Sequence, residues 1–120
     1  MSSPDKRSVL LQLARDSIQE VLEAKNSIDK ASLLEEHPLL NQAVATTINI
    51  YIDDELRGSA KSPAEPSSLI DEIIINSKKA AFEDSDFLAL STSEYLNCEI
   101  EIILETPDGT ISEKDPAIIQ

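Results

Sequence analysis

The sequence contains a single cysteine, Cys98, among its 120 residues. One thiol cannot form an internal disulfide, and it cannot supply the ligands of a zinc site built from cysteines. Residues 1–5 read Met-Ser-Ser-Pro-Asp, which does not resemble the start of a signal peptide. We therefore expect a reducing, cytoplasmic setting for this chain.

Basic residues are also scarce. Lysine and arginine together number 10 against 23 aspartates and glutamates, which gives a formal net charge of -13. Nucleic acid and anionic membrane surfaces require clustered cations, so neither is expected as a partner. No apolar run, residues 73–75 included, approaches the length needed to cross a bilayer. The acidity serves solubility in a crowded cytosol, and an acidic face made for a basic partner is the alternative.

The remaining composition is that of an ordinary globular domain. Hydrophobic residues make up 41% of the chain and charged residues 28%, which is not the composition of a disordered chain. A chain of this length can bury well over half of the surface that it exposes when unfolded. No internal repeat or linker divides it, and we predict one domain over residues 1–120.

Two stretches have the spacing of amphipathic helices. The first is predicted over about residues 4–25, with Ser3 as its N-cap and with Arg15 on its solvent-facing side. The second is predicted to follow Ser68 as N-cap and to end near residue 82. Its face of apolar or small residues comprises Leu69, Ile70, Ile73, Ile74, Ser77, Ala80 and Ala81.

Alternation with a period of two residues predicts strands elsewhere. Residues 47–53 carry isoleucines at every second position on one face. Residues 53–55 are predicted to turn, and residues 56–61 to return as the antiparallel partner. Residues 98–105 alternate between apolar residues and glutamates, and the turn residues 107–109 precede a short final strand.

The segments between these elements are predicted to be connectors. Residues 26–41 contain at most one short turn, because a proline interrupts them, and residues 62–67 form a loop. The predicted fold class is α+β, an antiparallel β-sheet or partial barrel with two main amphipathic helices packed outside. The inward-facing side chains are predicted to include Ile48, Ile50, Ile100 and Ile102.

Three segments, in order, carry motifs of a known family. Residues 10–18 read LLQLARDSI, residues 54–62 read DELRGSAKS and residues 80–87 read AAFEDSDF. They are similar to the helix L-x-x-L-A-R-x-A-I, the signature loop G-x-L-R-G-C-I-G-S and the segment A-A-F-x-D-P-R-F of the AMMECR-one domain family. This resemblance spans most of the chain, from Val9 to Pro107. It implies an α+β fold with helices packed outside a strand-rich core.

Two departures from the family pattern bear on function. Ser59 stands where the signature cysteine falls, and Ala60 and Lys61 replace its Ile-Gly. Family domains continue well beyond the position where this chain ends, so the resemblance implies a single shortened domain that lacks the C-terminal part. In the family the loop cysteine looks like a nucleophile or redox residue, a role that needs a thiolate. The resemblance therefore implies the family scaffold without its thiol chemistry.

The degenerate loop still offers candidate catalytic residues. A serine hydroxyl is hard to ionise, so Ser59 would need a base within hydrogen-bond reach. Lys61 lies on the same face if the stretch is a strand, and it would have to be desolvated to act as a neutral base. His37, the only histidine, is the other candidate base, although a solvated loop position explains it as well. The alternative to either dyad is that Ser59 is a plain loop hydroxyl.

Arg57, Gly58 and Ser59 are the candidate ligand-binding residues. An arginine offers a planar fork for a carboxylate or phosphate, and a glycine lets a ligand approach the backbone. The alternative is structural, because Arg57 can pair with Asp53 or Asp54 and fix the hairpin.

Two other sets of residues could bind a metal or react, but a structural role explains each of them. The carboxylates of Glu83, Asp84 and Asp86 are of the kind that hard cations prefer, but their spacing fits no known calcium loop and a solvated helix end explains them. We therefore predict no metal site, and the sequence does not identify a cofactor. Cys98 alternates with the apolar residues of its strand and is predicted to pack as a small hydrophobic residue.

Taken together, these features favour a non-catalytic binding or assembly module that acts through protein–protein contact. A shortened sheet leaves unpaired backbone groups along an edge, and another chain commonly covers such an edge. A homodimer or a dedicated protein partner is therefore expected. The alternative is a small enzyme, or a subunit of an enzyme system, with a degenerate loop site at residues 57–61.

Overall fold

The computed structural model describes residues 7–119. Among these residues, no helix combines the length and the apolar character needed to cross a membrane. The mixed content of helices and strands confirms the predicted α+β class. In chain order the elements are α1 (Val9–Glu23), α2 (Lys30–Glu36), the short 3₁₀ helix η1 (Pro38–Asn41), β1 (Ala45–Ile52), β2 (Glu55–Lys61), α3 (Leu69–Phe82), α4 (Thr92–Asn97), β3 (Glu99–Thr106) and β4 (Gly109–Asp115).

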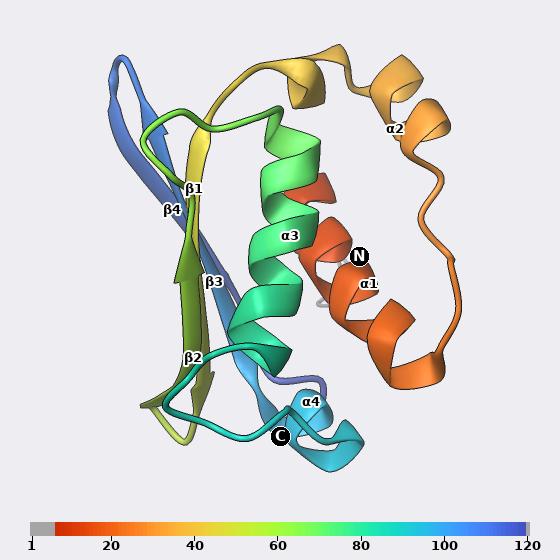
Figure 1. Cartoon of the computed structure of the whole chain (residues 1–120), viewed down its shortest axis with the longest axis vertical. Coiled ribbons are helices and arrows are strands. Elements are labelled where there is room, and N and C mark those ends of the chain that lie inside the picture. Colours follow the sequence, from red (N-terminus) through yellow and green to blue (C-terminus); the bar gives the residue numbers. More distant parts are fainter. Residues whose placement is uncertain (1–6, 120) are drawn as a thin grey trace, which may run out of the picture.

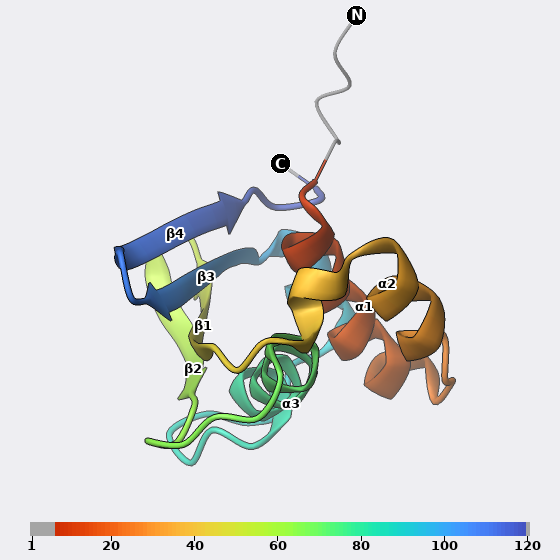
Figure 2. The ribbon, with the colours of Figure 1, turned by 90° about the horizontal axis from the view of Figure 1, so that it is seen from above.

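One antiparallel sheet organises the fold, with the strand order β2-β1-β3-β4. Figure 1 shows α1 and α3 on one side of this sheet, and α3 is the helix that contacts β1 and β2. Figure 2, seen from above, shows that the sheet stays open. Of the two predicted forms, the antiparallel sheet is therefore correct and the partial barrel is not. Within residues 7–119, no helix covers the other face of the sheet.

Isoleucines of the two central strands form the middle of the core. Ile48 and Ile50 on β1 are paired with Ile102 and Ile100 on β3, and none of the four has exposed surface. Paired residues of an antiparallel ladder lie on the same face, so all four side chains meet the helices. Each such side chain contributes about 1.5–3 kcal/mol through burial. The predicted inward face is confirmed.

α3 begins where the sequence predicted. The Ser68 side chain accepts a hydrogen bond from the backbone N–H of Asp71 and caps the helix, which ends at Phe82. Its predicted apolar face is buried, apart from the half-buried Ile74. Two polar side chains of α3 are buried as well, which the apolar pattern did not predict. They are Glu72, which accepts a hydrogen bond from the loop before α3, and Asn76, which donates one to β1.

The other helical segments differ from the prediction. α1 begins at Val9, with Ser8 as its N-cap, rather than near residue 4. The predicted cap, Ser3, lies outside the described residues. The segment 26–41 contains both α2 and η1, more structure than the single short turn that was predicted. Its proline begins η1, where a missing backbone N–H is tolerated.

Arg15 corrects a second prediction about α1. Its side chain is 1% exposed instead of facing solvent. It donates to Asp115 Oδ2 at 2.6 Å and to three backbone carbonyl oxygens. Position 15 lies one helical turn beyond the buried Leu11, and this spacing places it on the core side. A buried guanidinium requires such acceptors, so Arg15 ties α1 to the C-terminal end of β4.

Candidate functional site

The β1–β2 hairpin positions the residues of the family signature. Asp53 and Asp54 form its two-residue turn and have positive φ angles of 52° and 65°, as in a type I′ turn. The predicted turn is confirmed. Beyond it the register shifts between Ile50 and Tyr51, which leaves Arg57 as the extra residue of a β-bulge. The segment that resembles a signature loop is therefore part of strand β2.

The guanidinium of Arg57 is bound by groups of the protein itself. Its Nε donates to Glu94 Oε2 at 2.9 Å and its Nη2 to Glu94 Oε1 at 3.1 Å. Nη2 also donates to the carbonyl oxygen of Leu88 at 2.8 Å, and the guanidinium carbon lies 5.3 Å from the centre of the Phe87 ring. The partner of Arg57 is thus Glu94 of α4, and not a turn aspartate. Arg57 joins β2 to α4 and to the α3–α4 loop (residues 83–91).

Glu94 is held in its ionised form. The hydrogen bond from Arg57 lowers the pKa of Glu94 below its ordinary value of 4.5, and the backbone N–H of Ser91 lowers it further. Ser91 and Glu94 also form a capping box at the start of α4. The charge of Arg57 is therefore neutralised internally, while its buried Nη1 has no acceptor within residues 7–119.

Gly58 is required by packing. It is buried where β2 meets α3, and a Cβ at this position would lie 2.1 Å from the backbone oxygen of Ala80. This distance is far shorter than any real contact of a side-chain carbon. The space that the glycine leaves is thus filled by the helix on this side of the strand.

Ser59 has two partners, and neither is a base. Its Oγ donates to Asn49 Oδ1 at 2.6 Å, and its backbone N–H donates to Asp84 Oδ2 at 3.0 Å. Lys61 is exposed, and in the described chain no hydrogen bond or ion pair joins it to Ser59. His37 lies between α2 and η1. Figure 1 shows α2 on the side of the sheet where α1 and α3 lie. The structure therefore brings neither candidate base to the Ser59 hydroxyl.

Of the three carboxylates at the end of α3, that of Asp84 holds the loop that follows. Among residues 7–119, no group of three or more potential ligands is placed to hold a metal ion. Asp84 accepts hydrogen bonds from the backbone N–H groups of Ser59 and Asp86. It thereby covers part of the β2 edge and fastens the α3–α4 loop to it.

Cys98 packs in the core, as predicted, with no exposed surface. Burial raises the pKa of the Cys98 thiol above its ordinary value of 9.0, although the neighbouring Arg15 opposes the shift. A thiol in such surroundings is a poor nucleophile, because the reactive form is the thiolate.

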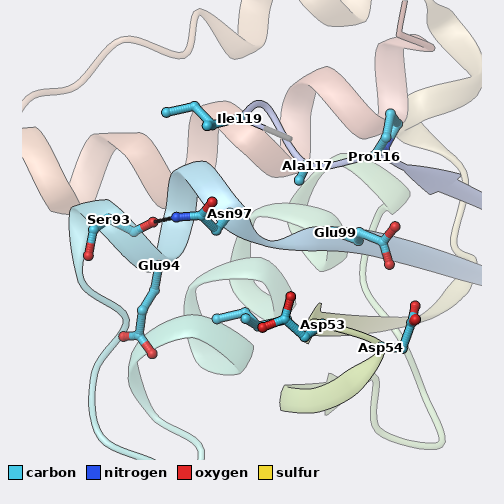
Figure 3. Close-up of a pocket in the computed structure, with 10 residues that line it drawn as sticks. Asp53, Asp54, Ser93, Glu94, Asn97, Glu99, Pro116, Ala117 and Ile119 are labelled. Atoms are coloured by element: carbon cyan, nitrogen blue, oxygen red, sulfur yellow. Dashed lines mark hydrogen bonds between the residues drawn. The ribbon is translucent and has the colours of Figure 1, made fainter.

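A pocket of about 640 Å³ lies beside the β1–β2 turn (Figure 3). The other walls are α4, the start of β3 and residues 116–119. The sequence did not predict this pocket, because its walls come from three separate segments of the chain. Four carboxylates line it, from Asp53, Asp54, Glu94 and Glu99.

Comparison with known proteins is consistent with this fold. The family model described as AMMECR1 matches residues 11–118, most of the chain. The chain belongs to the AMMECR1 family. The AMMECR1 domain described here is also similar to the crystal structure of the uncharacterized protein PH0010 from Pyrococcus horikoshii, with a TM-score of 0.72 and 23% sequence identity. The match covers 82% of this chain and 50% of that chain, and at this identity it shows the fold alone. No curated protein matches the sequence.

The residues around Arg57 were only partly accessible to sequence reasoning. Ser91 and Glu94 have the Ser-x-x-Glu spacing of a capping box, so the contact between them could be predicted from the sequence. The ion pair between Arg57 and Glu94 joins residues 37 positions apart, and no sequence pattern predicts it. The same holds for the contacts of Arg57 with the α3–α4 loop.

Proposed function

We propose that this AMMECR1 domain is a non-catalytic binding or assembly module that acts through contact with another protein. The observation that carries the proposal is the α3–α4 loop, which holds the side chain of Leu88 87% exposed. Phe87, beside it, is 37% exposed. Large apolar side chains held outside a fold are typical anchors of protein interfaces.

The loop is held in place by hydrogen bonds. The carbonyl oxygen of Leu88 accepts from Arg57, and the backbone N–H of Leu90 donates to Ala81 at 2.8 Å. The backbone N–H of Phe87 donates to the carbonyl oxygen of Asp84 at 3.2 Å. A loop that is already ordered loses little conformational entropy on binding. These contacts favour a preformed apolar anchor over a flexible one.

Charge indicates the chemistry of the partner. Glu83 and Asp86 are exposed in the same loop, and the guanidinium of Arg57 is already paired with Glu94. A partner surface complementary to this loop is an apolar hollow for Leu88 that is bordered by lysines and arginines. A second copy of this chain would add another net charge of -13, so repulsion favours an external partner over a homodimer. The buried, unpaired Cys98 favours a reducing, cytoplasmic setting.

The surroundings of Ser59 support a non-catalytic role. Its hydroxyl proton is directed to the amide oxygen of Asn49, which cannot act as a general base. A lysine that acts as a base has to be desolvated, and Lys61 is exposed to solvent. A serine nucleophile requires an adjacent base, and Ser59 has none among its hydrogen-bond partners. This arrangement favours a structural role for the Ser59 hydroxyl, which links β2 to β1.

Site-specific photo-crosslinking in cells of the source organism tests the proposal. A benzoylphenylalanine placed at position 88 is compared with one at position 111, because Ile111 is also exposed but lies on β4, at the opposite edge of the sheet. The expected result is a discrete product with one other protein from position 88 that position 111 does not give. Its yield is expected to fall for Arg57→Met, which frees the loop.

Two results would overturn the proposal. One is a set of crosslinked products that is the same from positions 88 and 111, which indicates contact by chance. The other is a product that contains only this chain, together with a dimer mass in light scattering of the purified protein. The second result would show that a homodimer occupies the surface.

A further inference from the structure

The two edges of the sheet differ in how their backbone groups are satisfied. At the β2 edge, the backbone N–H of Ser59 donates to Asp84 of the α3–α4 loop at 3.0 Å. The β-bulge at Arg57 also interrupts this edge. At the other edge, Figure 2 shows β4 with no helix or strand beside it among residues 7–119. Within the described chain, only the β2 edge is therefore covered.

The pairing of β4 with β3 determines which backbone groups of β4 are free. Residues 107–108 form a turn that closes on the pair Thr106–Gly109. A two-residue turn closes on a hydrogen-bonded pair, and such pairs recur at every second residue of an antiparallel ladder. The residues whose backbone N–H and C=O groups point away from β3 are therefore Thr110, Ser112 and Lys114. No group of residues 7–119 forms a hydrogen bond with these outward backbone groups.

The charged side chains at the end of β4 do not block its edge. Natural edge strands are often protected by a lysine or by charges that a neighbouring strand would have to bury. Lys114 instead extends back over the sheet, with its Nζ 3.3 Å from Glu99 Oε1 and 4.7 Å from the centre of the Tyr51 ring. Asp115 is bound by two arginines of the N-terminal segment and α1. Both side chains are held by the body of the domain, so the outward backbone groups stay accessible.

Two side chains beside the edge indicate the chemistry of its occupant. Ile111 is 54% exposed and is paired with the half-buried Leu104, so the apolar face of the sheet continues to the edge. Glu113 lies on the same face and accepts a hydrogen bond from Ser8 Oγ at 2.6 Å, but no cation among residues 7–119 forms an ion pair with it. An added strand that places an apolar side chain beside Ile111 and a cation beside Glu113 would complement both.

We infer that β4 receives an extended segment of another protein as a fifth, antiparallel strand of the sheet. A row of free N–H and C=O groups is complemented by an extended backbone, which presents partners with the same repeat. Along that strand a lysine or arginine comes two residues before an apolar residue, because antiparallel strands run in opposite directions. The net charge of -13 favours a basic segment and opposes pairing with β4 of a second copy. The inference goes beyond the proposed contact through Leu88, because the α3–α4 loop lies at the β2 edge.

The test adds the peptide Thr-Lys-Thr-Val-Thr, with blocked ends, to the isotope-labelled full chain. In antiparallel pairing its lysine lies beside Glu113 and its valine beside Ile111. The readout is amide hydrogen exchange by NMR. In the free chain, rapid exchange is expected at residues 110, 112 and 114 and slow exchange at residues 111 and 113, which are bonded to β3. At about 5 mM, the peptide is expected to slow exchange at the first set about threefold and to leave the second set unchanged.

Two N-methylated forms of the peptide provide matched controls. N-methylation of the threonines removes the donors that face β4 and is expected to abolish the protection. N-methylation of the lysine and the valine alters N–H groups that point away from β4, and this peptide is expected to retain the protection. Equal effects of the two peptides, or chemical shifts spread over the whole acidic surface, would show general attraction of charge and overturn the inference.

Variants of β4 test the edge itself. Ser112→Pro removes an outward N–H, which an edge strand tolerates, and is expected to abolish the protection, whereas Ser112→Thr keeps the N–H and should bind as the original chain does. Glu113→Gln is expected to weaken binding of the lysine peptide about threefold and to leave unchanged that of a peptide with norleucine in place of lysine. If Ser112→Pro unfolds the chain, the N-methylated peptides and Glu113→Gln still decide the outcome.

Two further results would overturn the inference. Slow exchange at residues 110, 112 and 114 of the free chain would show that the edge is already covered, and a dimer mass in light scattering would then assign it to a second copy. The other is an absence of protection by the peptide. Leu88→Ser should leave the protection unchanged, so a failure of this inference and a failure of the proposed function can be told apart.

Discussion

The most direct test of the fold around the signature segment is Gly58→Ala. The added Cβ would lie 2.1 Å from the backbone oxygen of Ala80, and ordinary contact begins at 3.4 Å. The obstacle is a helix carbonyl, which cannot rotate away as a side chain can. α3 must therefore move away from the sheet by about 1 Å, which loosens the contacts of a close-packed core.

Overpacking of this kind costs typically 1–3 kcal/mol, and the rigid obstacle places Gly58→Ala at about 3 kcal/mol. With a urea m value of about 1.5 kcal/mol/M, the midpoint of unfolding is expected to fall by about 2 M. Urea titration followed by circular dichroism measures this shift. The m value should remain unchanged, because the same surface is exposed on unfolding.

Gly109→Ala provides the matched control. Gly109 has a φ angle of 127° and open space around its Cβ position, so this variant reports backbone strain without a clash. A cost of about 1–2 kcal/mol is expected. In the Gly58→Ala background, Ala80→Gly should not restore stability, because the clash is with the carbonyl oxygen. A Gly58→Ala protein that unfolds within about 0.5 kcal/mol of the original would refute the packing argument.

Three further outcomes are expected. Arg15→Met removes the buried donor to Asp115 and to three backbone carbonyl oxygens, while Arg7 still pairs with Asp115. It should lower the free energy of unfolding by about 2–4 kcal/mol in urea titration, and a loss below about 1 kcal/mol would contradict the burial of the pair. Because Arg57 lowers the pKa of Glu94, this carboxylate stabilises the fold above about pH 4.5, and its contribution is lost as the pH falls through the lower pKa of the folded state. Glu94→Gln should therefore reduce the loss of melting temperature on the acid side of a pH profile. An unchanged profile would contradict the pairing of Glu94 with Arg57. Cys98 should react with a thiol reagent only as fast as the protein unfolds, and rapid labelling of the folded chain would show that the thiol is accessible.

The main elements could be predicted because their signals are local. Alternate isoleucines in β1 and β3 required a strand with one buried face, and the cap at Ser68 marked the start of α3. Burial of one face of a strand or helix leaves a period in the sequence that does not depend on distant contacts. For the same reason the predicted fold class is correct and the motif resemblance agreed with it.

The errors concern groups whose environment depends on distant segments. Arg15 reads as a solvent-facing charge unless Asp115, 100 positions away, is known to lie beside it. Arg57 lies next to two turn aspartates in the sequence, yet the bulge directs it to Glu94. Charged residues change from costly to favourable in the interior when they gain a partner, and the sequence does not record which partner they meet.

The sequence by itself determined the acidic character, the α+β class and the family motifs, because composition and short-range periodicity are properties of the chain alone. The tertiary structure alone decided what the signature segment does. It packed Gly58 against a helix carbonyl, paired Arg57 with α4 and built an acidic pocket from three separated segments. Sites of this kind arise from the way the sheet and helices meet, and spatial proximity is set by packing rather than by order along the chain.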